Sequence, residues 1–259
     1  MRKGYACGMS NPGFTQSLGY IPIGLRLLRK PGLRRFVWML ILINLMVFGG
    51  MGWLLYDLAT GWIDTLSLFD SWGDWWIVRA IETLLRWLVT LVLLFSMAFL
   101  FTLLANLIGA PFNGLLAERV EAHLTGDASE PSPSLVTLIK SVPRLMGSEL
   151  AKLLYLVICI VPILILHVIP VINVVAPLVL FLFGAWMFTL EYMDYPLGNH
   201  GMVFKEVRRE MRQHRKVAYG FGTGITVLSM IPIVNLIVMP VAVAGATALY
   251  VDLIRRQDS

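Results

Sequence analysis

The sequence predicts an all-α integral membrane protein that forms a single membrane domain over residues 1–259. Of the 259 residues, 58% are hydrophobic and only 14% are charged, and the mean hydropathy is +0.75. Soluble domains average about 45–50% apolar and about 25% charged residues. Lipid therefore has to cover part of this apolar surface. The chain ahead of Phe36 has neither the apolar core nor the cleavage site of a signal peptide.

Two apolar runs, residues 36–56 and 83–110, are long enough to cross a bilayer as helices. A hydrocarbon core of about 30 Å needs about 20 residues of helix. The second run is longer and is interrupted only by Arg86 and Asn106. We expect it to cross with a tilt or to project beyond the bilayer.

Two later apolar blocks, residues 153–190 and 217–251, share one turn pattern. Ile-Pro-Val-Ile-Asn ends at Asn173 in the first and Ile-Pro-Ile-Val-Asn ends at Asn235 in the second, and a further proline follows each. Neither turn carries a charge, so we predict two Pro-bent helical hairpins that penetrate the membrane only partly. Two ordinary hairpins with tight apolar turns are the alternative.

Two segments have the pattern of interfacial amphipathic helices. In residues 112–124 apolar side chains recur every four positions, and residues 202–216 combine an apolar edge of Val203, Val207 and Met211 with a basic side. The second segment fits a helix resting on anionic lipid headgroups. A role in drawing anions to a pore mouth is the alternative. The bilayer is thus an expected partner, and the net charge of +5 does not require nucleic acid.

The charge distribution predicts the topology. Residues 57–82 are acidic, whereas the basic residues gather before Phe36, in the later loops and at the C-terminus. Under the positive-inside rule the acidic loop faces outward and both termini are cytoplasmic.

No motif for nucleotide binding, metal-dependent hydrolysis or a catalytic serine occurs in the sequence, so we expect no enzyme, no cofactor and no metal site. Polar residues beside apolar segments are then the candidates for a transport pathway. Carboxylates there would repel an anion unless they were paired or protonated. Ion pairs between helices and interfacial anchoring are the alternative. The candidates are Glu118, Arg119, Glu121, Glu191, Asp194 and His200.

The clearest anion signal lies in residues 20–30. Pro22 suits the first turn of a helix, which would leave the amides of Ile23, Gly24 and Leu25 without carbonyl partners. Gly24 would leave room for an anion, and Arg26 adds a planar fork of donors. This combination suits a tetrahedral oxyanion. A positive-inside cluster ahead of the first span explains the same residues equally well.

Four blocks, GLRLLRKPGLRRFV, APFNGLLAERVEAHLTG, EYMDYPLGNHG and IPIVNLIVMPVAVAGATALYVD, run in order from Gly24 to Asp252. Together they resemble CysZ-type sulfate permeases. The resemblance implies sulfate uptake across the bacterial cell inner membrane for cysteine biosynthesis, channel-like or proton-assisted, without an ATPase of its own. It also implies a homo-oligomer with two long transmembrane helices and two partly penetrating hairpins.

The resemblance places the sulfate-binding site around Gly24, Leu25 and Arg26, and we add Arg29 from the same segment. A non-transporting membrane scaffold or lipid-interacting protein is the competing function.

Overall fold

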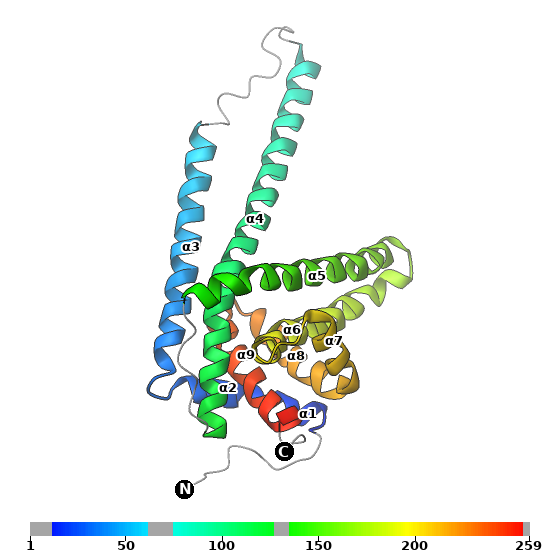
Figure 1. The fold of residues 1–259 in the computed structure, drawn as a ribbon. Helices are drawn as coiled ribbons and strands as arrows, with labels where there is room; N and C mark the ends of the chain where they lie inside the picture. Colours follow the sequence, from blue (N-terminus) through cyan, green and yellow to red (C-terminus); the bar gives the residue numbers. More distant parts are fainter. Residues whose placement is uncertain (1–11, 62–74, 127–134, 256–259) are drawn as a thin grey trace. The chain divides into compact units, whose positions relative to one another are not determined.

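The computed structural model describes residues 12–61, 75–126 and 135–255 (Figure 1). All regular structure in these ranges is helical, which confirms the predicted all-α class. The described residues form two compact units, one made of 12–40 with 110–255 and the other of 41–109 without its undescribed loop.

The smaller unit holds most of two long helices, α3 (Arg34–Gly61) and α4 (Trp76–Thr125), of 28 and 50 residues. The predicted spans 36–56 and 83–110 lie inside them. Helix α4 continues through Pro111, so the helix predicted over 112–124 is the last part of α4, and its Leu116 and Val120 are buried in the protein. Both helices leave large apolar side chains exposed, which suits contact with lipid; these include Trp38, Leu42, Leu45, Met46, Trp53, Leu84, Trp87, Leu88 and Phe95.

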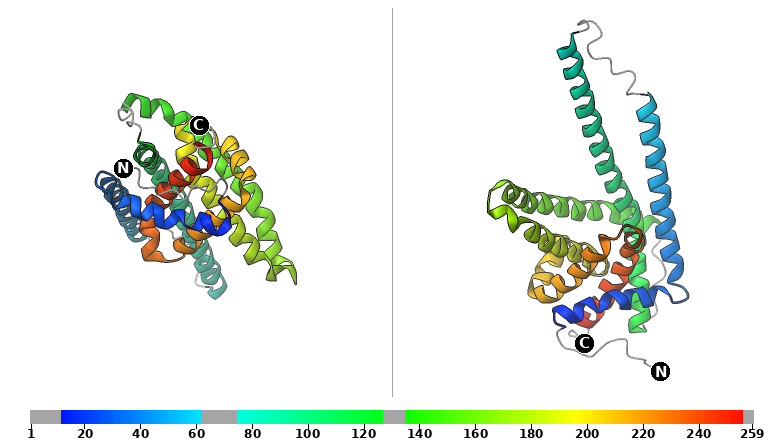
Figure 2. Two further views of the ribbon diagram at one scale, coloured as in Figure 1. Left: turned by 90° about the horizontal axis from the view of Figure 1, so that it is seen from below. Right: turned by 180° about the vertical axis from the view of Figure 1, so that it is seen from behind.

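The larger unit is built around α6, which packs against α5, α7, α8 and α9 (Figures 1 and 2). Helix α2 lies along α9, and α1 lies against α8. The helices of this unit other than α3 and α4 are α1 (Phe14–Leu18), α2 (Tyr20–Leu28), α5 (Leu135–Val168), η1 (Ile172–Val174), α6 (Ala176–Asn199), α7 (Phe204–Gln213), α8 (Arg215–Ser229), α9 (Pro232–Tyr250) and the π-helix η2 (Val251–Arg255).

Glycines let these helices approach until backbone meets backbone. A Cβ on Gly222 of α8 would collide with the carbonyl of Ala185 and lie 2.5 Å from Oγ1 of Thr189, both on α6. The Thr189 hydroxyl donates to the carbonyl of Ala218 at 2.6 Å, which joins the same two helices. Small residues at helix crossings are the usual means of close packing in membrane proteins.

The first hairpin consists of α5, η1 and α6, and it bends at the predicted Ile-Pro-Val-Ile-Asn segment. Its apolar arms, Gly147–Val168 and Ala176–Asn199, have 22 and 24 residues and are long and apolar enough to cross a membrane. They are longer than the apolar block alone indicated. How deeply this hairpin penetrates therefore stays a prediction.

The second hairpin, α8 and α9, turns between Ser229 and Pro232, just before the predicted tip over 232–235, which instead forms the first turn of α9. Helix α8 has 15 residues, which is roughly 22 Å and less than the hydrocarbon thickness. Helix α9 has 19 residues and continues directly into η2, so only the α8 arm is short. How deeply this hairpin penetrates therefore also stays a prediction.

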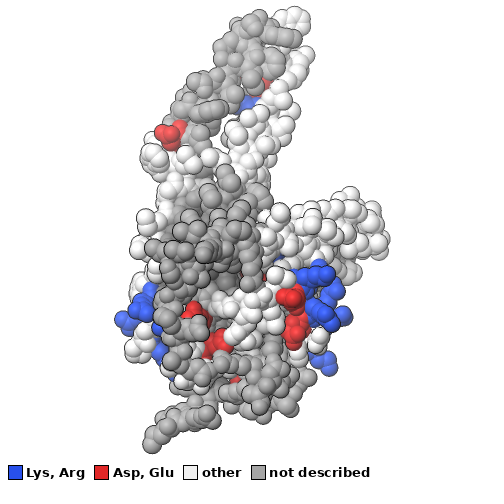
Figure 3. Space-filling view, in the orientation of Figure 1, with Lys and Arg blue, Asp and Glu red and all other residues white. Residues whose placement is uncertain are grey.

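Helix α7 is amphipathic as predicted, but its apolar side does not face lipid. Phe204, Val207 and Met211 are at most 4% exposed and pack into the protein core, whereas Val203 is 43% exposed. The protein itself covers this apolar edge, so only the basic side of α7 is left to meet lipid headgroups, and that contact stays a prediction. What α7 presents outward is its basic side, which Figure 3 shows as a blue patch on the right of the view.

We expect Gly222→Ala to lower the melting temperature of the protein in detergent, because the new methyl group has no room between α8 and α6. Overpacking of this kind typically costs about 1–3 kcal/mol. Gly184→Ala on α6 is the matched control, since nothing lies within 4 Å of the Cβ it would add. Equal melting temperatures for the two variants would contradict the close packing described here.

Candidate functional site

Helix α2 divides into a buried and a basic exposed side. Tyr20, Gly24, Leu27 and Leu28 are buried against the unit's core. The other side presents Leu25, which is 37% exposed, together with Arg26 and Arg29. Arg26 and Arg29 are three positions apart and so lie on the same face of the helix. The structure thus places the predicted sulfate-binding arginines side by side on an accessible surface.

Gly24 has a different role from the one that the sequence suggested. A Cβ at this position would collide with the carbonyl of Val241 and lie 2.7 Å from the amide nitrogen of Gly245, both on α9. The missing side chain therefore lets α2 pack on α9 and does not make room for an anion on that side. The amide of Ile23 already donates to the carbonyl of Gly19 at 3.3 Å, so the premise of a free amide there is wrong.

Two polar contacts fix the ends of α2. The Tyr20 hydroxyl donates to Oδ2 of Asp252 in η2 at 3.1 Å. Beyond the other end, Nζ of Lys30 contacts Nε2 of His123 on α4. Burial, and secondarily the Lys30 ammonium, lower the pKa of His123. A neutral imidazole can accept this hydrogen bond, so the contact holds the basic segment on the core.

The strongest concentration of charge lies between α5 and α6. Nζ of Lys152 is 2.7 Å from Oε1 of Glu149, 3.0 Å from Oε2 of Glu191 and 3.0 Å from Oδ2 of Asp194. The Lys152 side chain is only 6% exposed. We call these four residues the Lys152 cluster.

Two predicted pathway residues, Glu191 and Asp194, belong to the Lys152 cluster, whereas Glu149 and Lys152 were missed. The signal was present, because Glu149 and Lys152 are an i,i+3 pair at the start of an apolar helix. Charged residues at such positions need partners.

A chain of hydrogen bonds continues from this cluster to α4. Oη of Tyr195 donates to Oε1 of Glu191 at 3.4 Å and accepts from Nδ2 of Asn113 at 3.3 Å. Asn113 is fully buried. Its Oδ1 has no hydrogen-bond partner within the described ranges, which is unusual for a buried amide.

A second pair joins α4 to the end of α6. Nε2 of His200 lies 2.9 Å from Oε2 of Glu121, and the His200 ring packs on that of Tyr250 with centroids 5.1 Å apart. Glu118 and Arg119 lie beside Glu121 on α4, half-buried, and each has interactions of its own. The predicted pathway residues thus form two groups, and in the described part of the chain no ion pair joins either group to Arg26 or Arg29.

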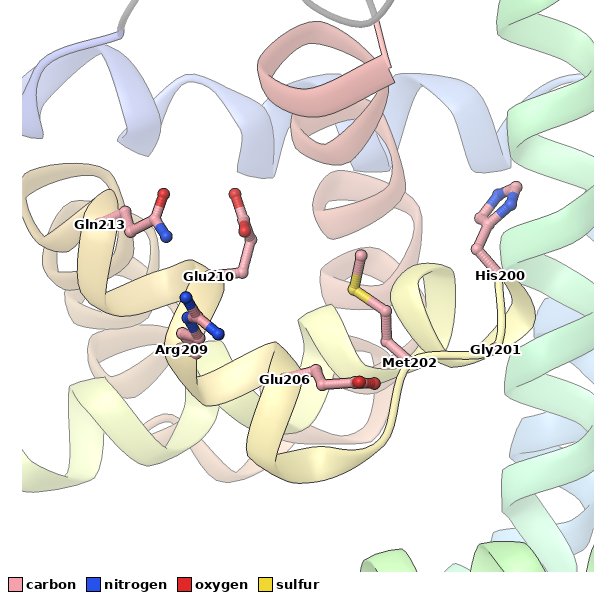
Figure 4. Close-up of a pocket in the computed structure, with 7 residues that line it drawn as sticks. All are labelled: His200, Gly201, Met202, Glu206, Arg209, Glu210 and Gln213. Carbon is pink, nitrogen blue, oxygen red and sulfur yellow. The ribbon is translucent and has the colours of Figure 1, made fainter.

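A cavity of about 490 Å³ lies between His200 and α7 (Figure 4). Its charged lining, Glu206, Arg209 and Glu210, comes from one helix and mixes both signs. Among the described residues no group of three His, Cys, Asp or Glu side chains is placed to hold a metal ion. His167, near the first hairpin's tip, contacts the carbonyl of Ile163 on its own helix at 2.9 Å through Nδ1, which fits a packing role.

Comparison with known proteins gives consistent matches over nearly the whole chain. The family model described as sulfate transporter CysZ/etoposide-induced protein 2.4 matches residues 20–240. A curated relative from Pectobacterium atrosepticum, named sulfate transporter CysZ, is 40% identical over 235 residues, which are 90% of this chain and 83% of the relative. The chain therefore belongs to the family of sulfate transporter CysZ and etoposide-induced protein 2.4.

Proposed function

We propose that this protein is a sulfate permease of the bacterial inner membrane that supplies sulfate for cysteine biosynthesis. The observation that carries the proposal is the 40% identity, over 90% of the chain, to a protein named sulfate transporter CysZ. The apolar helices support a membrane location. The sequence holds no nucleotide-binding motif, so transport is channel-like or proton-assisted and the protein is not an ATPase or another enzyme.

The sulfate-binding candidates are Gly24, Leu25, Arg26 and Arg29. Arg26 and Arg29 supply guanidinium donors suited to a tetrahedral anion. Gly24 contributes indirectly, because its contact with α9 fixes the helix that carries Arg26. Leu25 lies on the same accessible side.

Part of the negative charge of the pathway candidates is paired, which reduces their repulsion of an anion. Glu191 and Asp194 share Lys152, and Glu121 is paired with His200. A carboxylate that is neutralised by a nearby cation repels sulfate less than a lone one. Glu118 and Arg119 extend the second group.

The large exposed apolar surfaces of α5 and the two long helices need a cover of lipid or of further copies of the chain. A homo-oligomer in the bilayer fits this requirement.

We expect liposomes that contain only this protein to take up radiolabelled sulfate faster than empty liposomes, without ATP. Chloride at equal concentration should compete weakly. Sulfate flux equal to that of empty liposomes, from protein that elutes as a single folded species, would favour the scaffold function. That alternative draws on the outward basic side of α7.

We expect Arg26→Ala to weaken sulfate binding roughly 10- to 150-fold, because a charge-assisted hydrogen bond is lost. Arg26→Lys should restore binding only partly, since an ammonium cannot bind the anion bidentately. Arg34→Ala, exposed at the start of α3, is the control for general positive charge. Isothermal titration with sulfate measures all three. Equal losses at Arg26 and Arg34 would indicate a diffuse basic field and no defined site.

We expect cysteines introduced at Asp70 and Ser259 to react oppositely with an impermeant thiol reagent on intact spheroplasts, the first labelled and the second protected. Asp70 and Ser259 lie outside the described residues. A cysteine at Val171 should stay protected if the first hairpin stops short of the outer surface. Labelling at Ser259 to the level of Asp70 would mean that the predicted orientation is wrong.

A further inference from the structure

The Lys152 cluster places more negative than positive charge at one point between α5 and α6. Asp194 has a further interaction besides Lys152, so its charge is left out of the comparison that follows. Glu149 and Glu191 still share the single Lys152 ammonium, at 2.7 and 3.0 Å. Their side chains are 30% and 29% exposed and Lys152 is 6% exposed. One ammonium balances only one of the two carboxylates.

We propose that Glu149 and Glu191 bind one exchangeable proton between them. Two carboxylates that face the same cation repel each other, so one of them is neutral at a pH where an isolated glutamate is ionised. Their partial exposure gives the proton a route in and out. The ligand of the site is therefore a proton, and Lys152 keeps the remaining negative charge compensated.

The hydrogen-bond chain to Asn113 is an independent sign of such a site. The Tyr195 hydroxyl donates a hydrogen bond to Glu191 and accepts one from the Asn113 amide. Asn113 is fully buried, and its Oδ1 still needs a donor. A hydroxyl placed between a buried amide and a carboxylate can adjust its hydrogen bonds when Glu191 gains or loses a proton. A purely structural ion pair would not need the hydrogen bonds from Asn113 through Tyr195 to Glu191.

Neighbouring groups leave the proton as the best ligand. No group of carboxylates in the described ranges is arranged to hold a metal ion; here they surround an ammonium. The other titratable groups on the packed elements have contacts of their own, and of these Tyr192 and Tyr195 also lie within electrostatic range of Glu191. Tyr192 on α6 stacks on Phe188, Arg208 of α7 lies 4.7 Å above the Tyr155 ring, and Tyr219 of α8 packs on Trp186. His200 pairs with Glu121, and its ring packs on Tyr250 of α9.

Infrared difference spectroscopy of the purified full-length protein tests the proposal directly. Between alkaline and mildly acidic pH, the wild type should gain the C=O stretching band of a protonated carboxyl group that is shielded from bulk water. Glu191→Gln and Glu149→Gln should each remove that band, because one of the two carboxylates that share the proton is then missing. Glu206→Gln on α7, an exposed carboxylate, should leave it intact. No such band in the wild type, or a band that survives both cluster substitutions, would overturn the proposal.

Lys152→Gln gives a second, opposite readout. Without the ammonium the two carboxylates should hold their proton more tightly, so the band should persist to higher pH than in the wild type. A merely structural cluster predicts no band in either protein. If the variant does not fold, the wild-type titration and the two glutamine variants still decide the question.

The consequence for transport rests on the proposed function. A protonated site carries less negative charge, so sulfate flux into liposomes should rise as the pH falls, and Glu191→Gln should flatten this pH profile. Arg26→Ala should lower flux at every pH. Absence of flux in the wild type would count against the permease function alone, since the infrared band is measured without sulfate.

Discussion

Close backbone contact between helices is the constraint on which the larger unit depends. Lipid tails are as apolar as leucine, so helices in a membrane gain little from hydrophobic burial and depend on van der Waals packing and interhelical hydrogen bonds. Gly24 brings α2 onto α9, and Gly222 brings α8 onto α6. Once α2 is fixed in this way, the direction of Arg26 and Arg29 follows from the helix geometry. The candidate anion surface is therefore a product of packing two helices away from lipid.

The polar groups of this unit are constrained by their need for partners inside the protein. Two ion pairs join charged side chains of different elements in this unit: Lys152 with Glu191, and Glu121 with His200. Such pairs limit the cost of removing charge from water. They also leave a local imbalance of charge in the Lys152 cluster, where three carboxylates surround one ammonium.

The sequence was sufficient for the fold class, since apolar length and Pro-containing turns are local properties. It was insufficient for contacts between distant residues. Glu191 and Lys152 are 39 positions apart, His200 and Glu121 are 79 apart, and Tyr20 and Asp252 are 232 apart. Periodicity also shows that a helix face is buried without showing what buries it, so the sequence did not reveal that the protein core covers the apolar side of α7. A glycine at position 24 could make room for an anion or let two helices pack closely, and only the position of α9 decides between these explanations.

The bend of the first hairpin indicates the medium around it. Val171 has φ +73° and is 85% exposed. A β-branched residue in this conformation bears strain of about 1–3 kcal/mol. Moving a valine side chain from water into an apolar medium returns roughly 1.5–3 kcal/mol. In water a glycine would suit this bend better in every respect. In hydrocarbon, or against an apolar neighbour, the two terms nearly cancel and valine becomes an acceptable choice. An exposed valine at this turn therefore fits the prediction that the tip of the first hairpin lies in an apolar environment.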